Sequence, residues 1–158
     1  MKDRYRYDDS HHNWKSHDFR IMALEMLNTG LECASKFTLK LEAKATKEWN
    51  NVFFRFEITV MNAIKVATMF SDKGVYFKQD EDKKIAFLID TAHLTPAKYR
   101  VDIVAYVTDK FGEDHFLDGV YPGFFFEITD RINEHNSKVW HQQYWGAIHL
   151  QDAKILNE

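Results

Sequence analysis

Cysteine is nearly absent from this sequence, since Cys33 is the only one among its 158 residues. A single cysteine cannot form a disulfide within the chain or build a zinc site from cysteine ligands, so a cytosolic setting fits best. The sequence also lacks an apolar run near the ~20 residues that a membrane-spanning helix needs. Residues 1–9 are charged and contain no apolar stretch of a secretory signal. We therefore expect a soluble protein that is not exported.

Positive charge is not in excess either. The chain has 21 Lys and Arg against 24 Asp and Glu, which gives a net charge of -3. Proteins that bind nucleic acids usually carry a basic excess that neutralises phosphates, so we exclude that class. Glycine and proline are few, and 45% of the residues are hydrophobic and 15% aromatic. This composition is too apolar for a disordered chain and fits one domain with a single core.

From residue 19 onward, apolar and polar residues alternate with a period of two, which is typical of strands with one buried face. The pattern predicts strands over 19–27, 37–46, 53–60, 65–70, 85–90, 99–108, 115–117 and 124–129. Turns are predicted at 28–30, 49–51 and 112–114, and a charged loop at 79–84.

No segment has a sustained helical period with caps, so the sequence predicts an all-β chain. Short strands separated by turns indicate two packed sheets or a closed barrel. We favour an antiparallel β-sandwich of the immunoglobulin-like or jelly-roll-like kind. Residues 1–18 are polar and without a period, so we interpret them as a linker or N-terminal arm ahead of a domain over residues 19–158.

Catalytic motifs are missing from the sequence. It contains no glycine-rich phosphate loop, G-x-S-x-G elbow, H-E-x-x-H or C-x-x-C. His11, His12 and His17 lie close together in the arm, but a metal site needs three or four ligands on a rigid scaffold. We interpret these histidines as solvated polar residues, and we expect neither a metal nor a cofactor.

Aromatic residues are abundant, and several fall in turns or on polar strand faces where a core does not require them. Flat rings beside carboxylates, amides and arginines are the groups that recognise carbohydrate. The candidate carbohydrate-binding residues are Trp49, Phe53, Arg55, Glu57, Arg100, Asp102 and Tyr106. If the strands 53–60 and 99–108 are neighbours, these residues form an aromatic and polar groove. Alternatively, Phe53 and Tyr106 pack under a loop or at a dimer interface.

Glu57 and Asp102 also raise the possibility of a glycosidase, because such enzymes use two carboxylates about 5 to 10 Å apart. Most carboxylates on a strand face are solvated or paired with neighbours, here Arg55 and Arg100. We therefore favour binding over catalysis and assign no catalytic residue.

Six segments, taken in order, resemble a known family: the residues 21–28, 37–45, 54–58, 94–103, 124–128 and 145–150. Together they are similar to the C-terminal domain of the ATPase subunit of ABC transporters that export O-antigen polysaccharide, the Wzt type. The resemblance extends from about Phe19 to Leu150. The segment 94–103 has Ala97 where glycine is usual in the family, so its turn type differs.

The resemblance implies a noncatalytic β-sandwich that recognises O-antigen or a related cell-surface polysaccharide for export. It further implies a homodimer. The chain would be either a domain excised from a larger ATPase or one that is encoded alone. Its partners would be the ATPase and membrane subunits of the transporter, at the cytoplasmic face of a bacterial inner membrane. The dimer interface could use an edge strand in the segment Trp140 to Leu150. The alternatives are a small glycan-active hydrolase or lyase using Glu57 and Asp102, or a β-sandwich for protein contacts alone.

Overall fold

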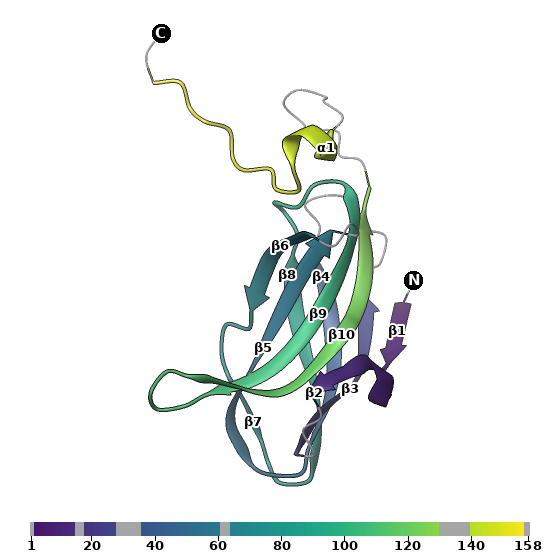
Figure 1. Ribbon diagram of the computed structural model, residues 1–158, viewed down its shortest axis with the longest axis vertical. Helices are drawn as coiled ribbons and strands as arrows, with labels where there is room; N and C mark the ends of the chain where they lie inside the picture. The colour runs from purple at the N-terminus through teal and green to yellow at the C-terminus, as the bar shows by residue number, and fades with distance from the viewer. Residues whose placement is uncertain (1, 15–17, 28–35, 61–63, 130–139, 157–158) are drawn as a thin grey trace.

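The structure is a computed structural model that describes residues 2–14, 18–27, 36–60, 64–129 and 140–156. Two antiparallel sheets pack face to face, with the larger one in front of the smaller one in Figure 1. The smaller sheet has the order β1-β3-β4-β8, made of Lys2–Arg6, Phe19–Leu27, Lys36–Ala45 and Glu81–Asp90. The larger sheet has the order β2-β10-β9-β5-β6, made of His12–Trp14, Asp114–Ile128, Ala97–Thr108, Trp49–Val60 and Ile64–Phe70. The short β7, Val75–Phe77, pairs with β5.

Helix is limited, in the part of the chain that the structure describes, to the 3-10 turn η1, Asp9–His11, and the single turn α1, Gln142–Trp145. The predicted all-β sandwich is thus confirmed. None of the described helices is long and apolar enough to cross a membrane.

The core lies between the two sheets, and the alternation of the strands builds it. Phe54, Phe56 and Ile58 of β5 are almost completely buried, whereas the residues between them point to the opposite face. The rings of Phe54 and Phe56 meet Phe87 of β8 edge-on, at centroid distances of 5.4 and 5.1 Å. Such contacts add to the free energy gained by burying the rings and fix how the sheets pack.

Three predicted boundaries were wrong. Residues 49–51 are part of β5, because Trp49 pairs with Phe77 of β7 and the strand continues. Residues 81–84 were expected in a loop but begin β8, where their backbone pairs with β4 despite four charged side chains in a row. The two short segments predicted after residue 112 are one strand, β10, interrupted by two irregularities in its register. A strand with polar residues on both faces shows no alternation of apolar and polar residues, so the sequence pattern does not reveal it.

The residues expected to form an arm ahead of the domain are part of the sandwich instead. β1 pairs with β3 in the smaller sheet, and β2 pairs with β10 in the larger one. Tyr7, between them, is buried and donates a hydrogen bond of 2.6 Å to the carbonyl of Gly123. The segment of residues 2–14 therefore connects the two sheets at one edge.

His12 is buried rather than solvated, which corrects the interpretation from sequence. Its Nδ1 lies 2.7 Å from Oδ1 of Asp118, and both side chains are only 1% exposed. The other carboxylate oxygen of Asp118 accepts the backbone N–H of Ile21 at 2.8 Å. Burial raises the pKa of Asp118, while the hydrogen bonds from Ile21 and His12 oppose that effect. His17 lies outside the described residues.

The segment Trp140 to Leu150 does not form the expected edge strand. It contains α1 and a single bridge between Ile148 and Leu94, and the residues after it lead away from the sandwich (Figure 1). Trp140 is held within the segment, because its indole Nε1 donates to the carbonyl of Gly146 at 2.7 Å. Glycine suits position 146, since φ there is +82°.

Candidate functional site

β5 and β9 are neighbours in the larger sheet, so the two candidate strands lie side by side. Phe53 is the register partner of Tyr106, and Glu57 is the partner of Asp102. Arg55 lies between the two pairs on the same face of β5. Because side chains alternate, this face points away from the core. Six of the seven candidate residues share it: Phe53, Arg55, Glu57, Arg100, Asp102 and Tyr106.

A row of stacked groups runs across this outer face. The rings of Phe53 and Tyr106 stack at a centroid distance of 5.9 Å and an angle of 26°. The guanidinium of Arg55 follows, with its Cζ 5.7 Å from the Tyr106 ring centroid and 5.1 Å from that of Phe116. Cation–π contacts of this kind hold an arginine flat against aromatic rings. The row ends at Phe116 of β10, whose ring is 44% exposed.

The two carboxylates of this face are each held by cations. Glu57 contacts Nζ of Lys65 and lies 3.5 Å from Nε of Arg55. Asp102 accepts a hydrogen bond of 2.8 Å from Nε of Arg100. Both side chains are only 12% exposed, although they face away from the core. Cross-strand carboxylates repel one another, so these cations stabilise the arrangement.

Phe116 and Tyr121 complete the face, and sequence reasoning missed both. Phe116 is the register partner of Tyr106. The sequence carried a signal for this pairing, because the predicted turn at 112–114 implies that the strands before and after it form a hairpin. Burial, followed by the negative charge of Glu57, raises the pKa of Tyr121 to about 12. The hydroxyl of Tyr121 is therefore protonated at neutral pH and able to donate a hydrogen bond. No sequence signal indicated Tyr121, because β10 is irregular between residues 120 and 124.

Tyr106 and Trp49 are placed differently from expectation. Tyr106 is only 7% exposed and is covered by its neighbours, so it supports Phe53 and Arg55 more than it offers its own ring. Trp49 packs against the core cluster, and its Nε1 lies 3.4 Å from the carbonyl of Asp18. The structure therefore does not bring Trp49 together with the other six.

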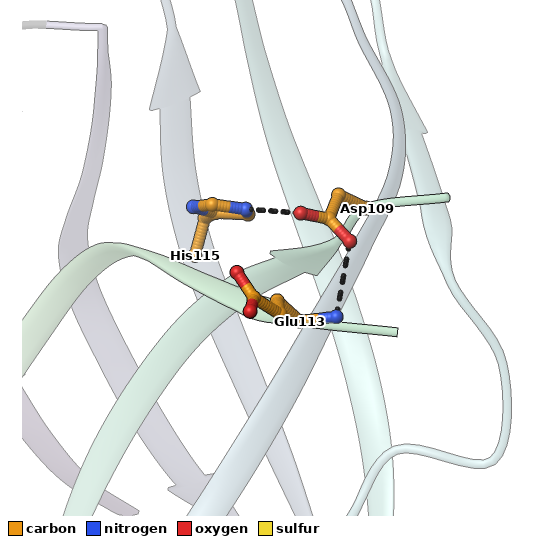
Figure 2. Close-up of side chains that lie close together, drawn as sticks. All are labelled: Asp109, Glu113 and His115. Carbon is orange, nitrogen blue, oxygen red and sulfur yellow. Dashed lines mark hydrogen bonds and ion pairs between the residues drawn. The ribbon is translucent and has the colours of Figure 1, made fainter. Parts of the chain in front are cut away.

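A second cluster lies at the tip of the hairpin between β9 and β10 (Figure 2). Ligand atoms of Asp109, Glu113 and His115 lie within 4.8 Å of one another, a donor set that suits a divalent transition metal. However, Oδ1 of Asp109 already accepts the backbone N–H groups of Phe111 and Glu113, and its Oδ2 lies 2.8 Å from Nε2 of His115. The contacts of Asp109 are those of a side chain that caps the turn.

This cap makes the hairpin sensitive to pH. The hydrogen bond to Asp109 raises the pKa of His115, and the same contact lowers the pKa of Asp109. Protonated His115 thus stabilises the hairpin below about pH 6.5, and that stabilisation is lost as the pH rises through the raised pKa.

We expect Asp109→Asn to return the pKa of His115 towards its ordinary value in an NMR titration. Glu127→Gln, at the far end of β10, should leave the titration unchanged; equal curves for all three proteins would contradict the assignment.

Comparison with known proteins points to one fold. No protein-family model matches the sequence, and no curated protein matches it. Among solved structures, the chain is similar to one described as the crystal structure of the C-terminal domain of wzt, with a TM-score of 0.70. The match covers 99% of this chain and 89% of that one, at 12% sequence identity. The resemblance recognised in the sequence is confirmed at the level of the fold, and the chain has the fold of a Wzt-type C-terminal domain.

Proposed function

We propose that this protein is a noncatalytic carbohydrate-binding domain that recognises O-antigen or a related cell-surface polysaccharide for export by an ABC transporter. The observation that carries the proposal is the stacked row on the outer face of the larger sheet. There, Tyr106 and Phe116 flank the guanidinium of Arg55, whose side chain is only 17% exposed, and Phe53 stacks on Tyr106. The shared fold with the C-terminal domain of wzt supports the same conclusion.

Recognition would combine stacking with hydrogen bonds. The exposed ring of Phe116 offers a flat apolar surface to the C–H face of a sugar. Arg100, with a side chain 39% exposed, supplies N–H donors, and Tyr121 supplies a hydroxyl. The carboxylates of Glu57 and Asp102 orient the arginines and accept hydrogen bonds from sugar hydroxyls at their exposed edges.

Calorimetric titration with the polysaccharide of the protein's own source cell tests this proposal, with unrelated O-polysaccharides as controls. Heat is a better signal than tryptophan fluorescence here. Trp49 packs against the core, and Trp140 and Trp145 contact each other away from the stacked row. Saturable binding of the cognate glycan alone is expected. A folded protein that binds no glycan would contradict the proposal and favour a β-sandwich for protein contacts.

The proposal includes a homodimer at the cytoplasmic face of the bacterial inner membrane, in contact with the ATPase and membrane subunits of the transporter. Two linked copies gain effective concentration, so weak individual glycan sites suffice. Trp145, 46% exposed, and Tyr144, 77% exposed, offer apolar surface for such contacts. Sedimentation at several protein concentrations tests the dimer, and a monomer at all of them would contradict it.

A glycan-active enzyme is the second candidate, and the pairing of Glu57 with Asp102 across β5 and β9 favours it. Both carboxylates lie on one face of a sheet and are paired with cations. A glycosidase instead places its carboxylates on opposite sides of the bond that it cleaves. Release of reducing ends from the bound polysaccharide, abolished in Glu57→Gln, would support the enzyme over the binding domain.

A further inference from the structure

The outer face of the smaller sheet carries a hollow of about 280 Å³, on the side of the sandwich opposite the stacked row. Four cationic side chains line it, together with two carboxylates: Arg4, Arg6, Lys40, Lys84, Glu25 and Glu42. The hollow therefore has two positive charges in excess, although the whole chain has a net charge of -3. Concave surfaces with charge of one sign focus the electric field and attract ions of the opposite sign.

The strand register explains why a hollow forms here. Ala23 of β3 lies between Arg6 of β1 and Glu42 of β4, and Lys84 of β8 follows in the same row. The pairing of β3 with β4 is irregular between Ile21 and Ala23. A small alanine at this irregularity leaves space in the row between Arg6 and Glu42, with Lys84 beyond Glu42.

Three of the four cations have no ion-pair partner in the part of the chain that the structure describes. Arg4 lies 3.7 Å from Glu25. Among the described residues, no ion pair or hydrogen bond engages the side chains of Arg6, Lys40 or Lys84, and all three are exposed. Glu25 lies opposite Lys40 and Glu42 lies opposite Lys84 in the register, but neither pair is within ion-pair distance, unlike Arg4 and Glu25. The three remaining cations around one hollow are available for an anion from outside the chain.

We propose that this hollow is a binding site for a phosphate group. Arg6 and Arg4 would bind phosphate oxygens through the planar guanidinium, and Lys40 and Lys84 would add point charges from the other side. Either free phosphate or the headgroup of an anionic lipid carries this chemistry. The site is on the other sheet from the proposed glycan face and does not depend on it.

The test is an NMR titration of the full chain with inorganic phosphate at low ionic strength, and a parallel flotation assay with vesicles containing phosphatidylglycerol. We expect saturable shifts of the backbone amides of Arg6, Ala23 and Lys84. The double variant Arg6→Gln/Lys84→Gln should weaken phosphate binding by about tenfold, because each charge-assisted hydrogen bond contributes strongly. The matched control Lys36→Gln/Lys44→Gln removes the same charge from the same sheet face outside the hollow.

Each outcome has a defined meaning. Saturable shifts that the hollow variant loses and the control keeps support the site. If vesicles then also bind and the hollow variant abolishes that binding, the source is a lipid headgroup; without vesicle binding, it is a free phosphate group. Phosphate shifts that do not saturate, or that both double variants weaken equally, would overturn the proposal in favour of general surface charge.

Discussion

Asp118→Ala should lower the free energy of unfolding by about 3 kcal/mol, because the substitution breaks a buried pair and leaves its partners without an acceptor. Asp118 is 1% exposed and binds both His12 of β2 and the backbone N–H of Ile21 in β3. Nε2 of His12 is itself buried and has no hydrogen-bond partner among the described residues, so the ring depends on Asp118 for its hydrogen bonding there. Loss of one carboxylate thus affects both sheets at once.

The measurement is chemical denaturation of the variant beside the parent protein, with amide hydrogen exchange at Tyr7 as a second readout. The N–H of Tyr7 bonds to the carbonyl of Met22 at 3.0 Å, so faster exchange there reports release of the N-terminal segment. Asp118→Asn keeps an acceptor oxygen for Ile21 and should cost less than Asp118→Ala. Asp82→Asn, an exposed carboxylate on β8, is the matched control and should change stability by less than about 0.5 kcal/mol. A denaturation midpoint for Asp118→Ala equal to that of the control would disprove the role of the pair.

The strands with one apolar face could be predicted from the sequence, and the others could not. Residues 37–45 alternate without a break, and β4 spans Lys36–Ala45 with the expected side buried. In contrast, the N-terminal residues have few apolar side chains, and their place in both sheets depends on backbone pairing and on the pair His12–Asp118. Such long-range contacts, separated by 106 residues, leave no local pattern.

The candidate site could be predicted from the sequence only where the exposed face of a strand could be assigned. The alternation in 53–60 and 99–108 assigned Phe53, Arg55 and Glu57 to one face, and the direct pairing of the two strands is a property of the sheet order. Trp49 was misassigned because the predicted turn at 49–51 is strand, and the irregular register beside β7 changes which side its ring takes. Phe116 was missed because Leu117 beside it is also apolar and the register of β10 shifts between Phe116 and Asp118, which obscures the period of two.

Phe116→Ala should weaken binding of the cognate polysaccharide by about thirtyfold, or ~2 kcal/mol, if the stacked row is the glycan site. Phe116 is the most exposed member of that row, and its ring also covers one side of the Arg55 guanidinium. Its removal therefore takes away a stacking surface and lets the guanidinium leave the plane in which it meets the sugar. Tyr106 is only 7% exposed, so Tyr106→Ala would destabilise the fold. A loss of glycan binding in that variant could not be separated from a loss of stability.

The hairpin provides the matched control for this prediction. Phe111 lies in the turn between β9 and β10, is 80% exposed and has its ring beside Lys110. Phe111→Ala removes the same number of atoms from the same hairpin, so it should leave the dissociation constant within about twofold of the parent value. Calorimetric titration of both variants, with denaturation curves to show that each remains folded, separates the roles of the two rings. Equal affinity for Phe116→Ala and Phe111→Ala would place the glycan elsewhere on the sandwich, because a row that binds sugar by stacking cannot lose its outermost ring without effect.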